Sequence, residues 1–307
     1  MPYEYNKYMA HNNHVIDGIN KEINNNFPNR EAYLKITEGW KSQLADPIVT
    51  DHEGVRVVRE DLALAGGTKS RAGEFLISQL KKKTVVYVVP RVGHAGIAIM
   101  ELAKIYNKDV IFFMPSSKEV SNHQAHIISM GPKEVIFERI AAMPNLNKIA
   151  KEFAEKNDYE FLPFGLNHPL TIAGFVRACE NILKNYKEPK ELWSVVSTGV
   201  LTRGTQIGFP NTDMNGVAVA RNMKSGELGR TKIISEPLPF LKDEKRENLP
   251  PFNSVPSYDA KAWKYIPKNT GRDVWFWNVA GNIECPKDFD KSKIDSYREW
   301  KKKSKSL

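Results

Sequence analysis

A lysine that follows two glycines has surroundings suited to nucleophilic chemistry. Lys69 stands within residues 66–71, Gly-Gly-Thr-Lys-Ser-Arg, and a segment expected to be helical follows at residues 72–80. An amine held near the start of a helix, desolvated and close to other cations, has a lowered pKa and attacks electrophiles more readily. The alternative is an exposed lysine at an ordinary helix N-terminus. When this run is considered alone, that alternative is favoured.

Two further runs contain glycine where a strand gives way to a helix. They are residues 90–96, Pro-Arg-Val-Gly-His-Ala-Gly, and residues 197–204, Ser-Thr-Gly-Val-Leu-Thr-Arg-Gly. Such a turn offers backbone N–H donors and the positive end of the following helix to an anion such as a phosphate dianion. In the second run, Thr198 and Thr202 add hydroxyl donors. The alternative is a tight turn that binds nothing.

The elements that position these runs alternate between short apolar strands and amphipathic helices. We expect strands at residues 85–89, 110–114, 134–137, 160–163 and 193–196, and helices at residues 95–106, 118–130, 145–157 and 168–186. Strands separated by helices imply right-handed crossovers and parallel pairing. The fold class is therefore α/β, with parallel sheets flanked by helices and ligands bound beyond the carboxyl ends of the strands.

Composition argues against several classes of protein. The chain has 307 residues and no apolar stretch near the ~20 residues that span a bilayer, and its first residues lack the apolar run of a secretory signal. Cys179 and Cys285 are too few for a disulfide framework and lack zinc-site spacing. We expect a cytoplasmic protein with no metal and no membrane contact. The net charge of +9 favours anionic partners, although a solvated basic surface is the simpler explanation.

Residues 59–71 resemble the lysine segment of the tryptophan-synthase-β-like, or fold type II, pyridoxal-phosphate enzymes, nearest to aminocyclopropane-carboxylate deaminase and D-cysteine desulfhydrase. Arg-Glu-Asp-Leu at residues 59–62 precedes the Gly-Gly-Thr-Lys-Ser-Arg run, as in that family. Further matches follow in register at residues 93–98, 114–115, 129–135, 174–178 and 258–262. The resemblance spans roughly residues 55–285. It implies that Lys69 forms a Schiff base with pyridoxal 5'-phosphate and that Arg71 is structural.

The resemblance also implies a two-domain fold and further site residues. The larger, cofactor-binding domain is expected to comprise residues 1–83 and 161–307, with a smaller α/β domain, residues 84–160, inserted in it. Relatives are commonly dimers, so a homodimer is expected. The residues expected to bind the cofactor are Lys69, His94, Thr198, Gly199, Val200, Leu201, Thr202 and Asn278. Those expected to bind the substrate are Arg91, Gly93, Ala95 and Tyr258.

Three positions depart from the family's pattern. His94 stands where an asparagine usually bonds the cofactor's phenolic oxygen, and histidine titrates near neutrality. Val92 replaces a hydroxyl that grips the substrate carboxylate, so either Arg91 grips it instead or the substrate has no carboxylate there. Val279 replaces the hydroxyl that meets the pyridine nitrogen, which leaves that nitrogen without its usual partner unless Asn278 or a water replaces it.

The motifs favour a pyridoxal-phosphate-dependent lyase or deaminase that acts on a small amine or amino acid through a Lys69 aldimine. Elimination, deamination and decarboxylation all remain open. One alternative is an enzyme of viral thymine hypermodification that acts on an amino-acid-decorated base in DNA, which the basic charge and the altered carboxylate turn also fit. Another is a non-catalytic descendant that keeps the fold as a binding module, which Val92 and Val279 suggest.

Overall fold

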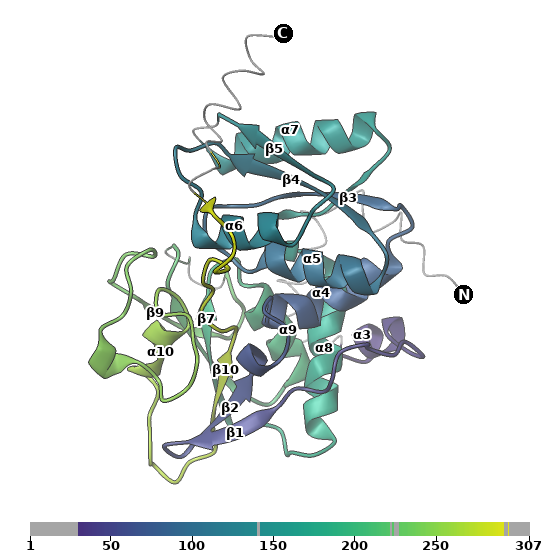
Figure 1. The fold of residues 1–307 in the computed structure, drawn as a ribbon. Coiled ribbons are helices and arrows are strands. Elements are labelled where there is room, and N and C mark those ends of the chain that lie inside the picture. The colour runs from purple at the N-terminus through teal and green to yellow at the C-terminus, as the bar shows by residue number, and fades with distance from the viewer. Residues whose placement is uncertain (1–29, 140–141, 222, 224–226, 292–293, 295–307) are drawn as a thin grey trace. The chain divides into compact units, whose positions relative to one another are not determined.

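The computed structural model describes residues 30–139, 142–221, 223, 227–291 and 294. The chain divides into two compact units, with Met1–Leu76 and Asn167–Asn282 in unit 1 and Ile77–Leu166 and Ile283–Leu307 in unit 2, as far as these ranges are described. Each unit has its own sheet with helices packed against it (Figure 1). No helix in the described part of the chain has both the length and the apolar character needed to cross a membrane.

The sheet of unit 1 has six strands in the order β1-β2-β10-β7-β8-β9. The strands are β1 (Val49–His52), β2 (Val55–Arg59), β7 (Glu191–Val196), β8 (Asp213–Ala218), β9 (Lys232–Ser235) and β10 (Val274–Asn278). All neighbours pair in parallel except β1 and β2. Because β2, β10 and β7 run in parallel, their carboxyl ends lie at the same edge of the sheet.

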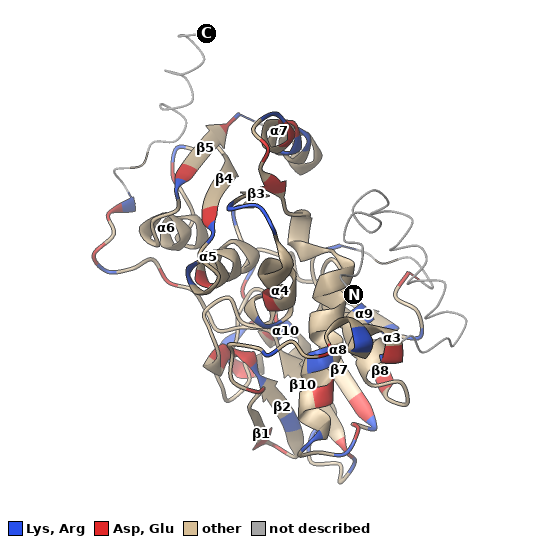
Figure 2. Cartoon of the chain, turned by 90° about the vertical axis from the view of Figure 1, so that its right-hand side faces the viewer, with Lys and Arg blue, Asp and Glu red and all other residues tan. Residues whose placement is uncertain are grey.

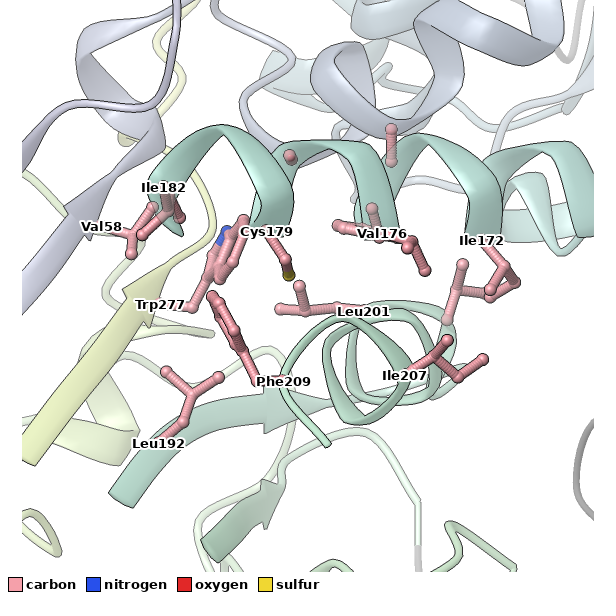
Figure 3. Close-up of a cluster of buried hydrophobic side chains, with 14 of the residues drawn as sticks. Val58, Ile172, Val176, Cys179, Ile182, Leu192, Leu201, Ile207, Phe209 and Trp277 are labelled. Carbon is pink, nitrogen blue, oxygen red and sulfur yellow. The ribbon is translucent and has the colours of Figure 1, made fainter. Parts of the chain in front are cut away.

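The helices of unit 1 bury apolar faces against this sheet. They are α3 (Arg30–Ile36), α4 (Thr68–Gln79, which continues into unit 2), α8 (Pro169–Leu183), α9 (Val200–Gly208) and α10 (Ala260–Trp263), with short 3-10 turns η1 (Glu60–Leu62) and η3 (Arg246–Asn248). Figure 3 shows α8 packed next to α9, with Cys179 pointing toward Leu201. A second cluster, which includes Val57, Val217 and Phe276, forms a separate part of the core.

Unit 2 contains a four-stranded parallel sheet in the order β5-β4-β3-β6. Its elements are β3 (Thr84–Val88), α5 (Ala95–Ile105), β4 (Asp109–Pro115), α6 (Asn122–Ser129), β5 (Glu134–Glu138), α7 (Met143–Lys156), β6 (Glu160–Phe161) and the turn η2 (Phe164–Leu166). All five residues of β3 are buried, as expected for a central parallel strand. The parallel α/β arrangement predicted from the alternating pattern is confirmed.

The predicted insert, residues 84–160, lies within unit 2. Unit 2 begins at Ile77, its first stretch ends at Leu166, and described residues after Ile283 are grouped with it. Two contacts of Lys291 belong to this grouping. Its ammonium nitrogen lies 3.0 Å from Glu119 Oε1 and 3.2 Å from Asn122 Oδ1. These contacts join positions more than 160 residues apart, which spacing along the sequence does not reveal.

Candidate functional site

Lys69 lies in the first turn of α4, and this turn is fixed against the end of β10. The Thr68 N–H donates to Val279 O at 2.8 Å. Gly67 has a φ of +57°, and a Cβ built on it would lie 2.2 Å from the same Val279 oxygen. Only glycine fits this close approach of two backbones. The glycine before the lysine segment therefore places Lys69 beside the carboxyl end of β10.

The amine of Lys69 has an altered affinity for protons. Burial, together with the positive charge of Arg203, lowers the pKa of Lys69 to about 8. At that value roughly a tenth of the amine is unprotonated at pH 7, far more than for an ordinary lysine. Lys69 can therefore act as a nucleophile or accept a proton near neutral pH. Two residues on, Arg71 makes a buried ion pair with Glu60 at 2.5 Å, a contact that suits a structural role.

The turn that follows β7 has the geometry of an anion cradle. Gly199 caps α9 in the left-handed conformation, with φ 76°. The first N–H groups of a helix have no partner within it, and those of Val200 and Leu201 belong to this first turn. Leu201 is packed in the core of unit 1 (Figure 3), so its backbone alone is available. The hydroxyl of Thr202 is buried and has no hydrogen-bond partner among the described residues.

Arg203 is a buried cation within this turn, and no role was predicted for it. Arg203 is 4% exposed, and its Nη2 donates to Asn167 Oδ1 at 3.1 Å and to Thr198 O at 2.8 Å. Within the described part of the chain it makes no ion pair. Burial lowers its pKa, which reflects the cost of holding this charge away from water. The signal available in the sequence was a basic residue inside a glycine turn.

Tyr258 and Asp259 join the ends of β7 and β10. The Tyr258 and Ser197 side chains form a hydrogen bond, and burial, with the charge of Asp259, raises the pKa of Tyr258. The fully buried Asp259 accepts hydrogen bonds at Oδ2 from the N–H groups of Val279 and Ala280, at 2.8 and 3.0 Å.

The remaining oxygen of Asp259, Oδ1, is buried and has no hydrogen-bond partner in the described structure. Burial raises the pKa of Asp259 to about 8, and the nearby charge of Asp61 adds to this effect. Asp259 was not among the predicted site residues, although it directly follows Tyr258 in a matched motif.

Asn278 is the last residue of β10 and lies next to these groups. Its Nδ2 donates to Asp61 Oδ1 at 2.7 Å and to Asn253 O at 2.9 Å. Its Oδ1 is buried and lacks a partner among the described residues. The backbone N–H of Val279 is already committed to Asp259. Asn278 therefore offers an oxygen acceptor, whereas Val279 offers no donor.

These contacts bring the predicted residues of unit 1 together at one edge of its sheet. One peptide group, that between Val279 and Ala280, accepts from the Thr68 N–H at its oxygen and donates its own N–H to Asp259 Oδ2. Arg203 is close enough for its charge to act on Lys69. The lysine, the cradle after β7 and the buried acid thus surround the carboxyl ends of β7 and β10, where open parallel sheets bind ligands.

The other predicted residues, from Arg91 to Ala95, lie in unit 2, in the turn between β3 and α5. Arg91 is exposed and its Nη2 donates to Glu119 O at 3.2 Å, Gly93 has φ +147°, and Ala95 is buried at the start of α5. The His94 ring packs edge-on against that of His123, with centroids 5.2 Å apart. Burial and the neighbouring histidines lower the pKa of His123 to about 3. The roles of these turn residues remain predictions.

No group of three or more His, Cys, Asp or Glu side chains in the described residues is arranged to hold a metal ion. The groups placed together at this site are instead an amine, an acid, an arginine and helix N–H donors. This set suits an organic anion that carries an electrophilic carbon.

Comparisons with known proteins agree on the fold. No protein-family model and no curated protein matches the sequence. Among solved structures, the chain is similar to an "ACC deaminase homologue", with a TM-score of 0.67 and 18% identity over 84% of this chain and 96% of that one. It is also similar to threonine deaminase isoform 2 from Solanum lycopersicum (0.63, 14%, covering 89% and 92%) and to maize serine racemase (0.63, 14%, covering 91% and 96%).

Proposed function

We propose that the chain is a pyridoxal-phosphate-dependent enzyme. The premise is its tryptophan-synthase-β-like α/β fold, which the motifs predicted and the likenesses to solved structures confirm. It would act as a lyase or deaminase on an amine or amino acid. The observation that carries the proposal is Lys69, an amine whose pKa is lowered to about 8, placed beside a helix N-terminus ready for an anion. The deaminases and the racemase that share the fold support the same class.

The residues of unit 1 fit this cofactor at three points. Lys69 would hold the aldehyde carbon, and the α9 N-terminus at Gly199–Thr202 would hold the phosphate. The unpartnered Oδ1 of Asp259 would meet the pyridine nitrogen, which Val279 cannot do. When bound, pyridoxal phosphate supplies a conjugated ring that takes up the negative charge developing next to a substrate's amine.

Each of these residues contributes to the chemistry through its own protonation state. Lys69 has a pKa suited to moving a proton to and from the substrate near neutral pH. Asp259 is held by two backbone N–H groups and has one oxygen left to bond a protonated nitrogen, which would favour its ionised form. Tyr258, bonded to Ser197, is a hydroxyl at the same edge and is proposed to contact the substrate.

The test is to add pyridoxal phosphate to the purified protein, reduce with borohydride and locate the modified lysine by peptide mass spectrometry. We expect an absorption band near the visible edge and a label confined to Lys69. Lys69→Ala should abolish both. Lys268→Ala is the matched control, because burial also lowers the pKa of Lys268. A label spread over many lysines, or a band that survives Lys69→Ala, would contradict the proposal.

A second measurement separates an enzyme from a non-catalytic module. Turnover of any compound in a panel of amino acids and amines, lost in Lys69→Ala, would exclude the module. Cofactor bound at Lys69 with no turnover of free amines would direct the search to amines carried on larger anionic molecules, including decorated bases in DNA.

A further inference from the structure

Arg203 is a positive charge that the protein buries without compensation from a carboxylate. Glu227 is the acid whose charge acts on it, and Glu227 is itself paired with Arg221. Only Nη2 of Arg203 is hydrogen bonded, to Asn167 Oδ1 and Thr198 O, while Nε and Nη1 bond no residue that the structure describes. A buried and unpaired guanidinium is costly. Its presence at this place indicates that an anion completes the site.

The position of Arg203 makes the α9 N-terminus the place for that anion. A Cβ built on Gly199, the residue that caps α9, would lie 3.0 Å from Arg203 Nη1. The guanidinium therefore lies directly over the cap. The buried, unpartnered hydroxyl of Thr202 stands on the same turn and is a second, independent group in need of a partner. Val200 and Leu201, in the same turn, have no hydroxyl to give.

We propose that Arg203 is the charged residue that binds the phosphate group of the cofactor, so that this cradle recognises a phosphate dianion by charge. The identity of the phosphate carrier rests on the proposed function, whereas the need for an anion beside Arg203 does not. Guanidinium and phosphate form short, charge-assisted hydrogen bonds that are stronger than those to neutral donors. Bound phosphate would also offset the charge by which Arg203 lowers the pKa of Lys69.

The experiment compares affinities for pyridoxal phosphate, for pyridoxal, which lacks the phosphate, and for inorganic phosphate. Binding is followed by quenching of tryptophan fluorescence and by thermal shift, for wild type, Arg203→Met, Arg203→Lys and Arg230→Met. Arg230 is a matched control, because its guanidinium donates to the backbone oxygens of Thr212, Gln206 and Phe209 near the other end of α9.

We expect Arg203→Met to lose about 10- to 100-fold in affinity for pyridoxal phosphate and for inorganic phosphate, with little change for pyridoxal. Arg203→Lys, which keeps the charge, should lose less. Arg230→Met should leave the preference for pyridoxal phosphate over pyridoxal unchanged. Retained affinity for pyridoxal shows that Arg203→Met is folded, so that its loss of phosphate binding reports on the site.

The outcomes for the two proposals can be told apart. If wild type binds pyridoxal phosphate at Lys69 and Arg203→Met keeps the same preference for it over pyridoxal, the role of Arg203 is wrong and the proposed function stands. If wild type does not bind pyridoxal phosphate at Lys69 but binds inorganic phosphate through Arg203, the anion site stands and the proposed function is wrong. If no anion binds to wild type, both are wrong.

Discussion

Lys69 and Asp259 have pKa values that burial moves in opposite directions, toward the same region of pH. Burial disfavours the charged form of each group, so it lowers the pKa of the Lys69 amine and raises the pKa of the Asp259 carboxyl. Both pKa values come to about 8. The two groups are linked through the peptide group between Val279 and Ala280, which donates to Asp259 and accepts from Thr68, the residue before Lys69. Groups with pKa values near the working pH are suited to exchanging protons.

The reactivity of Lys69 should follow this pKa. We expect acylation of Lys69 by acetic anhydride to rise with pH and reach half of its maximum near pH 8, because only the unprotonated amine reacts. Competitive labelling with mass spectrometry measures the rate at each pH, and the exposed Lys81 in the same sample serves as the reference. A Lys69 profile that coincides with that of Lys81 would contradict the desolvation of this amine.

The stability of the ligand-free protein should depend on the protonation of Asp259. Its folded pKa of about 8 exceeds the unfolded value near 3.8, so its stabilising contribution is complete below about pH 4 and is lost as the pH rises through 8. Asp259→Asn does not titrate. We expect the free energy of unfolding of wild type to fall from pH 5 to pH 8 more steeply than that of Asp259→Asn, by a few kcal/mol.

Urea unfolding at several pH values, followed by tryptophan fluorescence, measures this difference for Asp259. Asp288→Asn, a change at an exposed acid, should leave the wild-type slope in place. Equal slopes for wild type and Asp259→Asn would show that the acid is ionised in the folded protein across this range.

At the scale of the elements, the close approach of α4 to β10 depends on Gly67. An alanine there would need φ +57° and would place its Cβ 2.2 Å from Val279 O. Gly39→Ala is the matched control, because its φ is +74° but nothing lies within 4 Å of the added Cβ. We expect Gly39→Ala to cost ~1 kcal/mol of unfolding free energy and Gly67→Ala roughly 1 to 3 kcal/mol more. Similar losses for both would show that α4 shifts without penalty.

The long segment after β9 is held by a buried lysine. Lys261 donates to Pro239 O at 2.8 Å and to Phe240 O at 3.2 Å, with Leu238 O at 3.5 Å, and is itself 0% exposed. Lys261→Met removes the donor for these carbonyls, so we expect cleavage by a protease within residues 236–249 to become faster, with a loss of roughly 1 to 3 kcal/mol in stability. Unchanged cleavage would show that other contacts hold the segment.

Elements with a clear apolar pattern, such as β3 and α8, were predicted from the sequence, whereas β1, whose pattern is short and polar, was not. β3 and α8 were predicted within a few residues, because burial on both faces gives β3 an unbroken apolar run and α8 has a helical period of apolar residues. β1, with the sequence Val-Thr-Asp-His, has no such run and was not predicted. α6 begins at Asn122, later than expected, because Ser121 caps it with a capping box to Gln124.

The candidate site was predicted only where a motif carries it. The lysine and the cradle after β7 follow from runs of neighbouring residues. The roles of Asp259 and Arg203 depend on burial and on contacts with residues 20 or more positions away, such as Asp259 with Val279 and Arg203 with Asn167. No local pattern in a single sequence records these contacts.

At the scale of the whole molecule, the net charge of +9 bears on the choice between substrates. Figure 2 shows basic and acidic residues interspersed over the described elements of both units, and Lys301, Lys302, Lys303 and Lys305 lie outside the described residues. A basic protein binds DNA weakly and with strong salt dependence whatever its function. Affinity for DNA alone is therefore not evidence of a DNA substrate.

The ratio of affinities decides this question. We expect the protein to bind plain DNA and DNA with an amine-bearing base equally at the same salt concentration, with both affinities falling as salt rises, since a small amine is the proposed substrate. Fluorescence anisotropy with matched duplexes gives the ratio. A preference of tenfold or more for the amine-bearing duplex that persists at high salt, and that Lys69→Ala removes, would instead support a modified base as the substrate.

The peptide group between Val279 and Ala280 gives this protein a spectroscopic reporter of its own site. The Ala280 N–H of this group donates to the Asp259 carboxyl and its Val279 oxygen accepts from Thr68, so each bond polarises the other. Loss of the Asp259 proton strengthens the acceptor and should move the Ala280 amide nitrogen resonance as the pH passes about 8. An isotope-labelled sample would thus show, without any substitution, when the acid ionises and whether a bound ligand changes that point.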